Sequence, residues 1–359
     1  MNNLFDYLDW RGDISFASVE PVNADYAVFC SLSYIPFDGV LPDTSKEGFV
    51  PLRDAAVKVL ELMKKRGKKP GYHLPGDEKL LNRVAGSERF GKLEAGCYVN
   101  IYDPVKQEQF SAVTFMLPDG SMVVTFRGTD GTIVGWKEDF NMGFMEELPS
   151  QKEAVGYVNR LARDNSGKMY LCGHSKGGNL AMYAAAFAHK DVQERIVAVR
   201  GLDSPGFKDS TTGRRGFTRV VDRMETFIPQ SSIVGLLLEH KEKYRVVYSS
   251  AKGRKQHNIY TWGILGGDFV GEKSLSGSGI RTNEAINSWI TDMSDEKRMK
   301  LTDGIYEIIE ATQAETLDEL FEAKNLFTVM KNLGKMDEET KELVAETGRI
   351  IRNSRKKSL

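Results

Sequence analysis

One serine lies in a pattern that could make it a nucleophile. The stretch Gly173-His174-Ser175-Lys176-Gly177 contains Gly-x-Ser-x-Gly. Residues 168–172 are short and mostly apolar, as in a buried strand, and residues 180–188 are rich in alanine, as in a helix. A serine at such a strand-to-helix turn exposes its hydroxyl above a helix N-terminus, and the glycines relieve the crowding. These flanks favour a nucleophile elbow over an ordinary glycine-rich turn.

A nucleophilic serine needs a base, which in hydrolases with this turn follows the serine in the chain. Three histidines qualify. His189 lies at the far end of the helix that follows the serine, about 20 Å away at 1.5 Å per residue. His240 ends an apolar run and is expected at the polar end of a helix. His257 lies in a loop after the strand expected at 244–248, so we predict that it is the base.

The base needs an orienting acid, which is expected at the carboxyl end of a strand. Asp203 directly follows the apolar run 196–202 and is the predicted acid. A plain turn residue before Pro205 is the alternative for this aspartate. The competing acids are Asp222, Glu225 and Asp268.

Two groups are expected to stabilise an oxyanion. The backbone N–H of Lys176, the residue after the nucleophile, is one donor. Thr129 follows an earlier strand and can donate its own N–H and hydroxyl, although a simple turn is the alternative. Trp136 and Asp139 lie one helical turn apart and are expected to anchor the Thr129 loop. His174 is expected to pack or to hydrogen-bond rather than to catalyse, and His73 has no expected role.

Strand and helix patterns alternate through the middle of the chain. Strands are predicted at 109–117 and 121–126, joined by Pro118-Asp119-Gly120, and at 196–202, 224–228 and 244–248. Helices are predicted at 26–34, 51–65, 77–85 and 152–165. This alternation indicates an α/β fold with a mostly parallel central sheet flanked by helices. We divide the chain into an N-terminal helical region (1–95) packing on the core, a catalytic core (96–281) and a C-terminal helical extension (282–359).

Composition excludes several classes of protein. The 359 residues include 49 Lys+Arg and 50 Asp+Glu, so charge favours neither a nucleic-acid nor an anionic-membrane partner. Three widely spaced cysteines fit neither a disulfide framework nor a zinc site. No signal peptide is visible and no window reaches ~18 apolar residues, so we expect a cytoplasmic protein without integral membrane contact. No phosphate-binding or metal motif occurs, so no cofactor and no metal are expected.

The motifs together resemble a known family. Phe126-Arg127-Gly128-Thr129, Trp136, Asp139 and Gly173-His174-Ser175-Lys176-Gly177-Gly178-Asn179-Leu180-Ala181 are similar to class 3 lipases, a branch of the α/β-hydrolases. The whole chain resembles an uncharacterised bacterial group of lipase-like α/β-hydrolases. The resemblance covers about residues 96–280 by motif. It implies Ser175 as nucleophile, Thr129 and Lys176 at the oxyanion hole, and His257 as base.

The sequence departs from class 3 lipases at two positions. Their acid follows a later strand, where Pro229 to Gly235 here contains serines but no acid. The stretch Gly201 to Pro205 is instead similar to pancreatic-type lipases, which supports Asp203. Lys176 replaces the usual apolar residue after the nucleophile, and it is expected either to pair with a local carboxylate or to favour a polar or anionic substrate.

Three functions remain open from the sequence. The first is a serine hydrolase that cleaves a carboxylic ester of a small molecule or lipid through a Ser-His-Asp triad and an acyl-enzyme. The second is a thioesterase or acyltransferase with the same triad. The third is a non-catalytic binding or regulatory protein on a hydrolase scaffold, which has no need for all three triad residues. The oligomeric state is not indicated.

Overall fold

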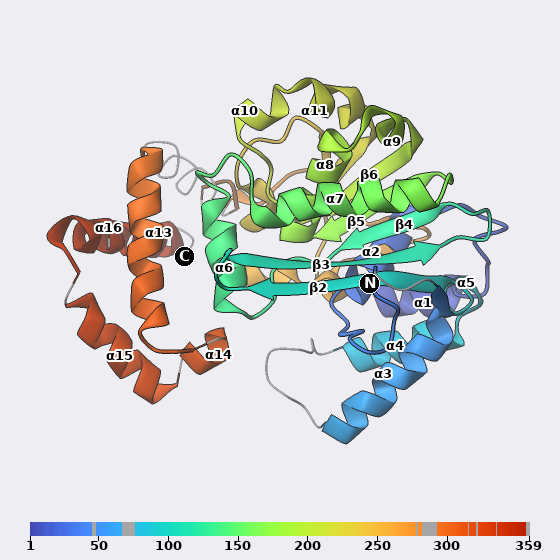
Figure 1. Cartoon of the computed structure of the whole chain (residues 1–359), viewed down its shortest axis with the longest axis horizontal. Coiled ribbons are helices and arrows are strands. Elements are labelled where there is room, and N and C mark those ends of the chain that lie inside the picture. The colour runs from blue at the N-terminus through green and yellow to red at the C-terminus, as the bar shows by residue number, and fades with distance from the viewer. Residues whose placement is uncertain are drawn as a thin grey trace.

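The computed structural model describes residues 1–44, 48–66, 76–277, 279–281, 293–314, 316–320, 322–334 and 336–356. A sheet of eight strands runs in the order β1 to β8, with helices on both faces (Figure 1). Its strands are β1 Phe49–Pro51, β2 Glu94–Asp103, β3 Glu108–Met116, β4 Met122–Phe126, β5 Met169–His174, β6 Ile196–Leu202, β7 Met224–Pro229 and β8 Lys243–Val247. A separate pair is formed by β9 Ile264–Leu265 and β10 Asp268–Phe269.

Strand pairing in the sheet changes from antiparallel to parallel at β4. Strands β1 to β4 pair antiparallel, and β4 to β8 pair parallel. The predicted hairpin at residues 118–120 joins β3 to β4, and Gly120 supplies φ +80° there. The carboxyl ends of the five parallel strands therefore meet at one edge of the sheet.

Helices on one face come from the crossovers between the parallel strands. Because these strands follow one another in order, right-handed crossovers place their helices on the same face. The crossover helices are α6 Ile133–Asn141, α7 Pro149–Asp164, α8 Lys176–Phe187, α9 Lys190–Arg195, α10 Asp209–Thr212 and α11 Arg215–Val220. Met169 and Leu171 of β5 belong to the apolar core under α7 and α8.

The opposite face is covered by the N-terminal residues. Their helices are α1 Leu4–Arg11, α2 Asn23–Leu32, α3 Leu52–Arg66, α4 Asp77–Gly86 and α5 Glu88–Gly91. Tyr170 and Cys172, which alternate with Met169 and Leu171 along β5, pack in this second core. The N-terminal residues thus close the face that the crossovers leave open. They also contain a strand, β1, beside the predicted helices.

The C-terminal helices lie beside α6, to one side of the sheet (Figure 1). They are α13 Asp295–Glu310, α14 Leu317–Leu320, α15 Ala323–Leu333 and α16 Glu338–Lys356. Met293, Leu301 and Leu343 form a small apolar cluster among them. Across the described ranges of the chain, no helix combines the length and apolar character needed to cross a membrane.

One sequence prediction about the fold is wrong. The apolar run 233–238 forms only a 3₁₀ turn at Val234–Leu236, so His240 does not end an α-helix. The backbone N–H of Gly235 donates to the Asp203 carboxylate at 3.0 Å, which takes it out of regular helix bonding. The mostly parallel sheet with helices on both faces confirms the predicted α/β-hydrolase fold.

Candidate active site

Ser175 occupies the turn between β5 and α8. Its backbone has φ +58° and ψ −133°, a region that residues with a side chain rarely adopt. The glycines on either side are required by close approach. A Cβ on Gly173 would lie 2.1 Å from the Gly177 carbonyl carbon, and one on Gly177 would lie 2.2 Å from the Phe126 oxygen. The structure therefore contains the strand–turn–helix context that the Gly-x-Ser-x-Gly pattern predicts.

Asp203 and His257 are brought together from different strands. Asp203 follows β6 and is buried, and its Oδ2 lies 2.7 Å from His257 Nδ1. Its other oxygen accepts from the Gly235 N–H at 3.0 Å and from the Ser232 hydroxyl. Both oxygens of this carboxylate are thus held by contacts. The His257 side chain is 33% exposed, so one end of the pair is buried and the other reaches solvent.

The competing acids have other positions and partners. Asp222 precedes β7, at the opposite edge of the sheet from the carboxyl end of β6. Glu225 and Asp268 both contact Arg245, at 2.8 Å each. The acid in contact with His257 Nδ1 is Asp203, at 2.7 Å.

Of the remaining histidines, His174 lies beside His257, and His189 and His240 have other surroundings. The His174 ring lies 4.3 Å from the His257 ring, which sets the residue before Ser175 directly beside His257. His240 Nδ1 lies 2.6 Å from Glu242 Oε1, and His189 precedes α9. His73 lies outside the described residues.

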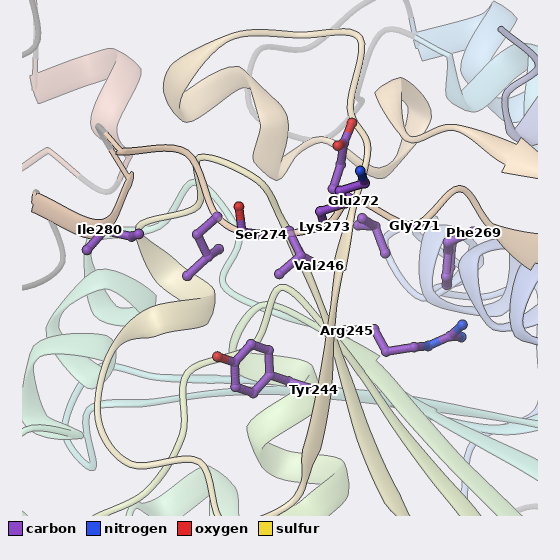
Figure 2. Close-up of a pocket in the computed structure, with 11 residues that line it drawn as sticks. Tyr244, Arg245, Val246, Phe269, Gly271, Glu272, Lys273, Ser274 and Ile280 are labelled. Carbon is purple, nitrogen blue, oxygen red and sulfur yellow. The ribbon is translucent and has the colours of Figure 1, made fainter.

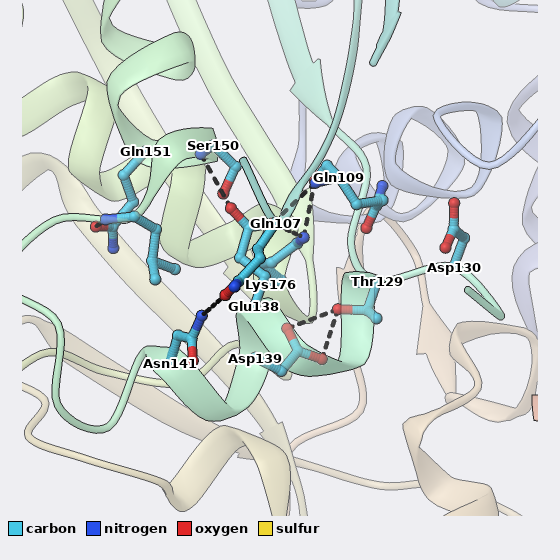
Figure 3. Close-up of polar contacts among 12 residues, drawn as sticks. Gln107, Gln109, Thr129, Asp130, Glu138, Asp139, Asn141, Ser150, Gln151 and Lys176 are labelled. Atoms are coloured by element: carbon cyan, nitrogen blue, oxygen red, sulfur yellow. Dashed lines mark hydrogen bonds and ion pairs between the residues drawn. The ribbon is translucent and has the colours of Figure 1, made fainter. Parts of the chain in front are cut away.

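Thr129 lies in the loop after β4, next to the serine turn. A Cβ on the neighbouring Gly128 would lie 2.9 Å from the Ser175 Cβ, so this loop touches the elbow. The Thr129 hydroxyl lies 2.7 and 2.6 Å from the two Asp139 oxygens (Figure 3). Burial raises the pKa of Asp139 to about 6, while Lys176 and the Thr129 hydrogen bond act against that rise. Asp139 thus anchors the Thr129 loop, as the spacing predicts.

The Lys176 side chain is buried in an ion pair. Its Nζ lies 2.6 Å from Glu138 Oε2 and donates to the Gln109 carbonyl at 2.8 Å (Figure 3). Glu138 also accepts from the Ser150 N–H at 3.0 Å. Of the two roles expected for Lys176, the structure contains the pairing with a local carboxylate.

A surface hollow lies away from Ser175, Asp203 and His257. It measures about 570 Å³ and is lined by residues 244–247 of β8 and by residues 269, 271–275 and 280 (Figure 2). Ser175, Asp203 and His257 are not among its lining residues. Arg245 in its wall is already bound to Asp268. We therefore place the candidate site at Ser175, Asp203 and His257, because of their chemistry, and not at this hollow.

Sequence reasoning missed three contributors to this site. Glu138 stands between the recognised Trp136 and Asp139, but nothing in its spacing indicated a partner 38 positions away. Ser232 binds the predicted acid from the loop after β7, where the sequence showed only that serines stand in place of an acid. Tyr34 bonds His174 from 140 positions away, and no local pattern connects them.

Comparison with solved structures finds lipases at low identity. M37 lipase is 17% identical, covering 59% of this chain and 68% of its own, with a TM-score of 0.38. The Rhizomucor miehei lipase propeptide complex is 11% identical, with coverage of 63% and 67% and a TM-score of 0.38. A triacylglycerol lipase from Penicillium expansum is 15% identical, with coverage of 47% and 72% and a TM-score of 0.32. No curated protein matches the sequence.

A family model gives the assignment that these distant structures do not. The model described as Mbeg1-like matches residues 84–307, which is more than half of the chain. The matched range begins before β2 and extends into α13, so it includes the elbow, the Thr129 loop, Asp203 and His257. The chain belongs to the Mbeg1-like family.

Proposed function

We propose that this protein is a serine hydrolase that cleaves a carboxylic ester, with Ser175 as nucleophile, His257 as base and Asp203 as orienting acid. The observation that carries the proposal is the 2.7 Å contact between His257 and a buried Asp203, one strand from the Ser175 elbow. A buried carboxylate is costly unless it is paired. Here it is paired with a histidine that is partly open to solvent.

The proposed reaction proceeds in two steps. His257 Nε2 takes the proton of the Ser175 hydroxyl as the oxygen attacks the ester carbonyl, and Asp203 accepts the Nδ1–H. The backbone N–H groups of Lys176 and Thr129 stabilise the oxyanion. The alcohol leaves with the proton from His257, and an acyl-enzyme remains. Water, deprotonated by His257, then releases the acid and restores the serine.

The same groups would act on a thioester, or would transfer the acyl group to an acceptor other than water. The substrate is therefore proposed as a small-molecule or lipid ester, with thioester hydrolysis and acyl transfer as the alternatives. The Lys176 ammonium is bound to Glu138, so we do not assign it to an anionic substrate group. A binding scaffold without chemistry is disfavoured, because it has no use for the buried Asp203–His257 pair.

Labelling with a fluorophosphonate tests the nucleophile. We expect the full-length protein to be labelled and to hydrolyse short p-nitrophenyl esters, and we expect Ser175→Ala to lose both while staying folded. Ser210→Ala, at an exposed serine of α10, is the matched control and should keep both. Labelling and hydrolysis that persist in Ser175→Ala would remove the proposal. Faster turnover of a matched thioester would select the thioesterase alternative.

A further inference from the structure

The Tyr34 hydroxyl lies where two loops of the proposed site meet. Tyr34 comes two residues after the end of α2, in the N-terminal part of the chain. Its oxygen lies 2.8 Å from His174 Nδ1. A Cβ on Gly128 would lie only 2.4 Å from the same oxygen, so the hydroxyl also touches the loop that carries Thr129.

Hydrogen-bond roles in this group follow from one carbonyl. His174 Nε2 lies 2.8 Å from the backbone oxygen of His257, and a carbonyl oxygen can only accept. His174 Nε2 therefore carries the hydrogen. In a neutral imidazole the Nδ1 is then the acceptor, so the Tyr34 hydroxyl donates to it. The chain of donors runs from Tyr34 through His174 to the backbone of His257.

Burial keeps this chain of donors in one protonation state. Burial lowers the pKa of His174 well below its usual value, and the charge of His257 lowers it further, although the hydrogen bond to the His257 backbone acts against the fall. Burial raises the pKa of Tyr34, although Arg127 and a backbone hydrogen bond from Gly128 oppose the rise. Cys30 and Asp139 also act on Tyr34, both in the direction of a higher pKa. A neutral phenol and a neutral imidazole result.

We propose that Tyr34 and His174 are positioning residues, which hold the backbone of the base His257 in register with the loop of Thr129. This inference rests on the proposed function. Asp203 fixes the His257 ring at Nδ1, while the neighbouring Gln256 is held by the Ser231 N–H and by Trp262 Nε1. None of these three bonds is made to the backbone oxygen of His257 itself. The His174 ring lies tilted against the His257 ring, with their centres 4.3 Å apart, and its bond to the His257 carbonyl fixes the backbone as well. The N-terminal residues thus supply part of the catalytic geometry.

The test removes one hydroxyl in the full-length protein. Tyr34→Phe should lower kcat on a p-nitrophenyl ester about 10- to 100-fold, the cost of a misplacement near 1 Å, with KM within about twofold. Tyr26→Phe is the control, because Tyr26 is a buried tyrosine within α2 whose ring faces Arg200 and not His174. It should leave kcat unchanged. Equal kcat values for the two variants would overturn the proposal, and so would a loss confined to KM.

Substitution of His174 gives a second test. The glutamine side chain has an oxygen that can accept from Tyr34 and an N–H that can donate to the His257 carbonyl, whereas leucine has neither. His174→Gln should therefore retain at least about tenfold more kcat than His174→Leu. Equal losses in the two variants would contradict the inference.

The tautomer can be measured without any activity. Nitrogen-15 NMR of the five histidines in the full-length protein should place the hydrogen of a neutral His174 on Nε2 at pH 7. An Nδ1–H or a protonated His174 would overturn the inference even in an active enzyme. If His174 has the expected tautomer but fluorophosphonate does not label the protein, the Tyr34–His174 contact stands and only the proposed function is overturned.

Discussion

The carboxyl edge of the sheet and the helices after residue 293 are held by different kinds of contact. The edge lies between two large apolar cores, and its charged groups Asp203, Lys176 and Glu138 are buried and paired. Among the C-terminal residues that the structure describes, the buried apolar cluster is small. α13 is joined to the rest by polar contacts, such as Lys137 to Asp303 at 3.3 Å and Arg298 to the Gly143 carbonyl at 2.6 Å.

The two regions meet at α6, where three consecutive residues face three different neighbours. Lys137 lies against α13, with its Nζ 3.9 Å from the centre of the Tyr306 ring. Glu138 binds Lys176, and Asp139 binds Thr129. The site and the C-terminal helices therefore use different side chains of one helix. We infer that residues 282–359 are an addition to the catalytic core proposed at 96–281.

The largest effect should come from the edge of the sheet. Asp203→Asn should lower kcat on the order of 10⁴-fold, as in other triads, because the histidine loses its correct tautomer. Asp222→Asn is the control, because that acid lies at the opposite end of β7 and should leave kcat near its original value. Steady-state kinetics on a p-nitrophenyl ester measure both. A large loss of kcat in Asp222→Asn but not in Asp203→Asn would show that Asp222 is the orienting acid.

Two substitutions separate the buried contacts of α6 from its outer contacts. Glu138→Ala leaves the Lys176 ammonium buried without its partner, so the free energy of unfolding should fall by about 3–5 kcal/mol. Asp303→Ala breaks the Lys137 pair, in which the aspartate side chain is 57% exposed, and should cost less than ~1 kcal/mol. Urea unfolding compares the two. If Asp303→Ala costs as much as Glu138→Ala, the C-terminal helices are not a peripheral addition.

A smaller effect concerns the pH dependence of stability at Asp139. Because its pKa rises from 3.8 to about 6, the folded protein binds this proton more tightly than the unfolded chain. This contribution to stability is therefore full below about pH 4 and is lost as the pH rises through about 6. Asp139→Asn should remove that decline, as measured by urea unfolding at pH 4 to 7. The same pH dependence in both proteins would show that Asp139 has an ordinary pKa.

Local patterns explain which elements could be predicted from the sequence. The elbow was predictable because its strand, its glycines and its helix are contiguous, and the hairpin because Pro118-Asp119-Gly120 separates two apolar runs. Asp203 could be predicted as the acid because it directly follows a strand. Each of these features depends on residues that are close together in the sequence, so the spacing of residue types indicates it.

Long-range partners could not be predicted in the same way. The sequence left Lys176 with two roles, because only the folded chain brings Glu138 to it across 38 positions. Tyr34 reads as the end of an apolar helix, and its contact with His174 depends on how that helix lies on the sheet. The run 233–238 has the composition of a helix, but its Gly235 amide is bound to Asp203.

The backbone conformation of Ser175 and Asp203 has a consequence for the evolution of the protein. Ser175 and Asp203 both have positive φ, +58° and +47°, where a side chain costs on the order of 1 kcal/mol or more. Glycine would relieve that strain, and total stability is typically only about 5–15 kcal/mol. A lineage under selection for stability alone would drift towards glycine at both positions. The proposed function would oppose that drift, because it requires the serine hydroxyl and the aspartate carboxylate at these two positions.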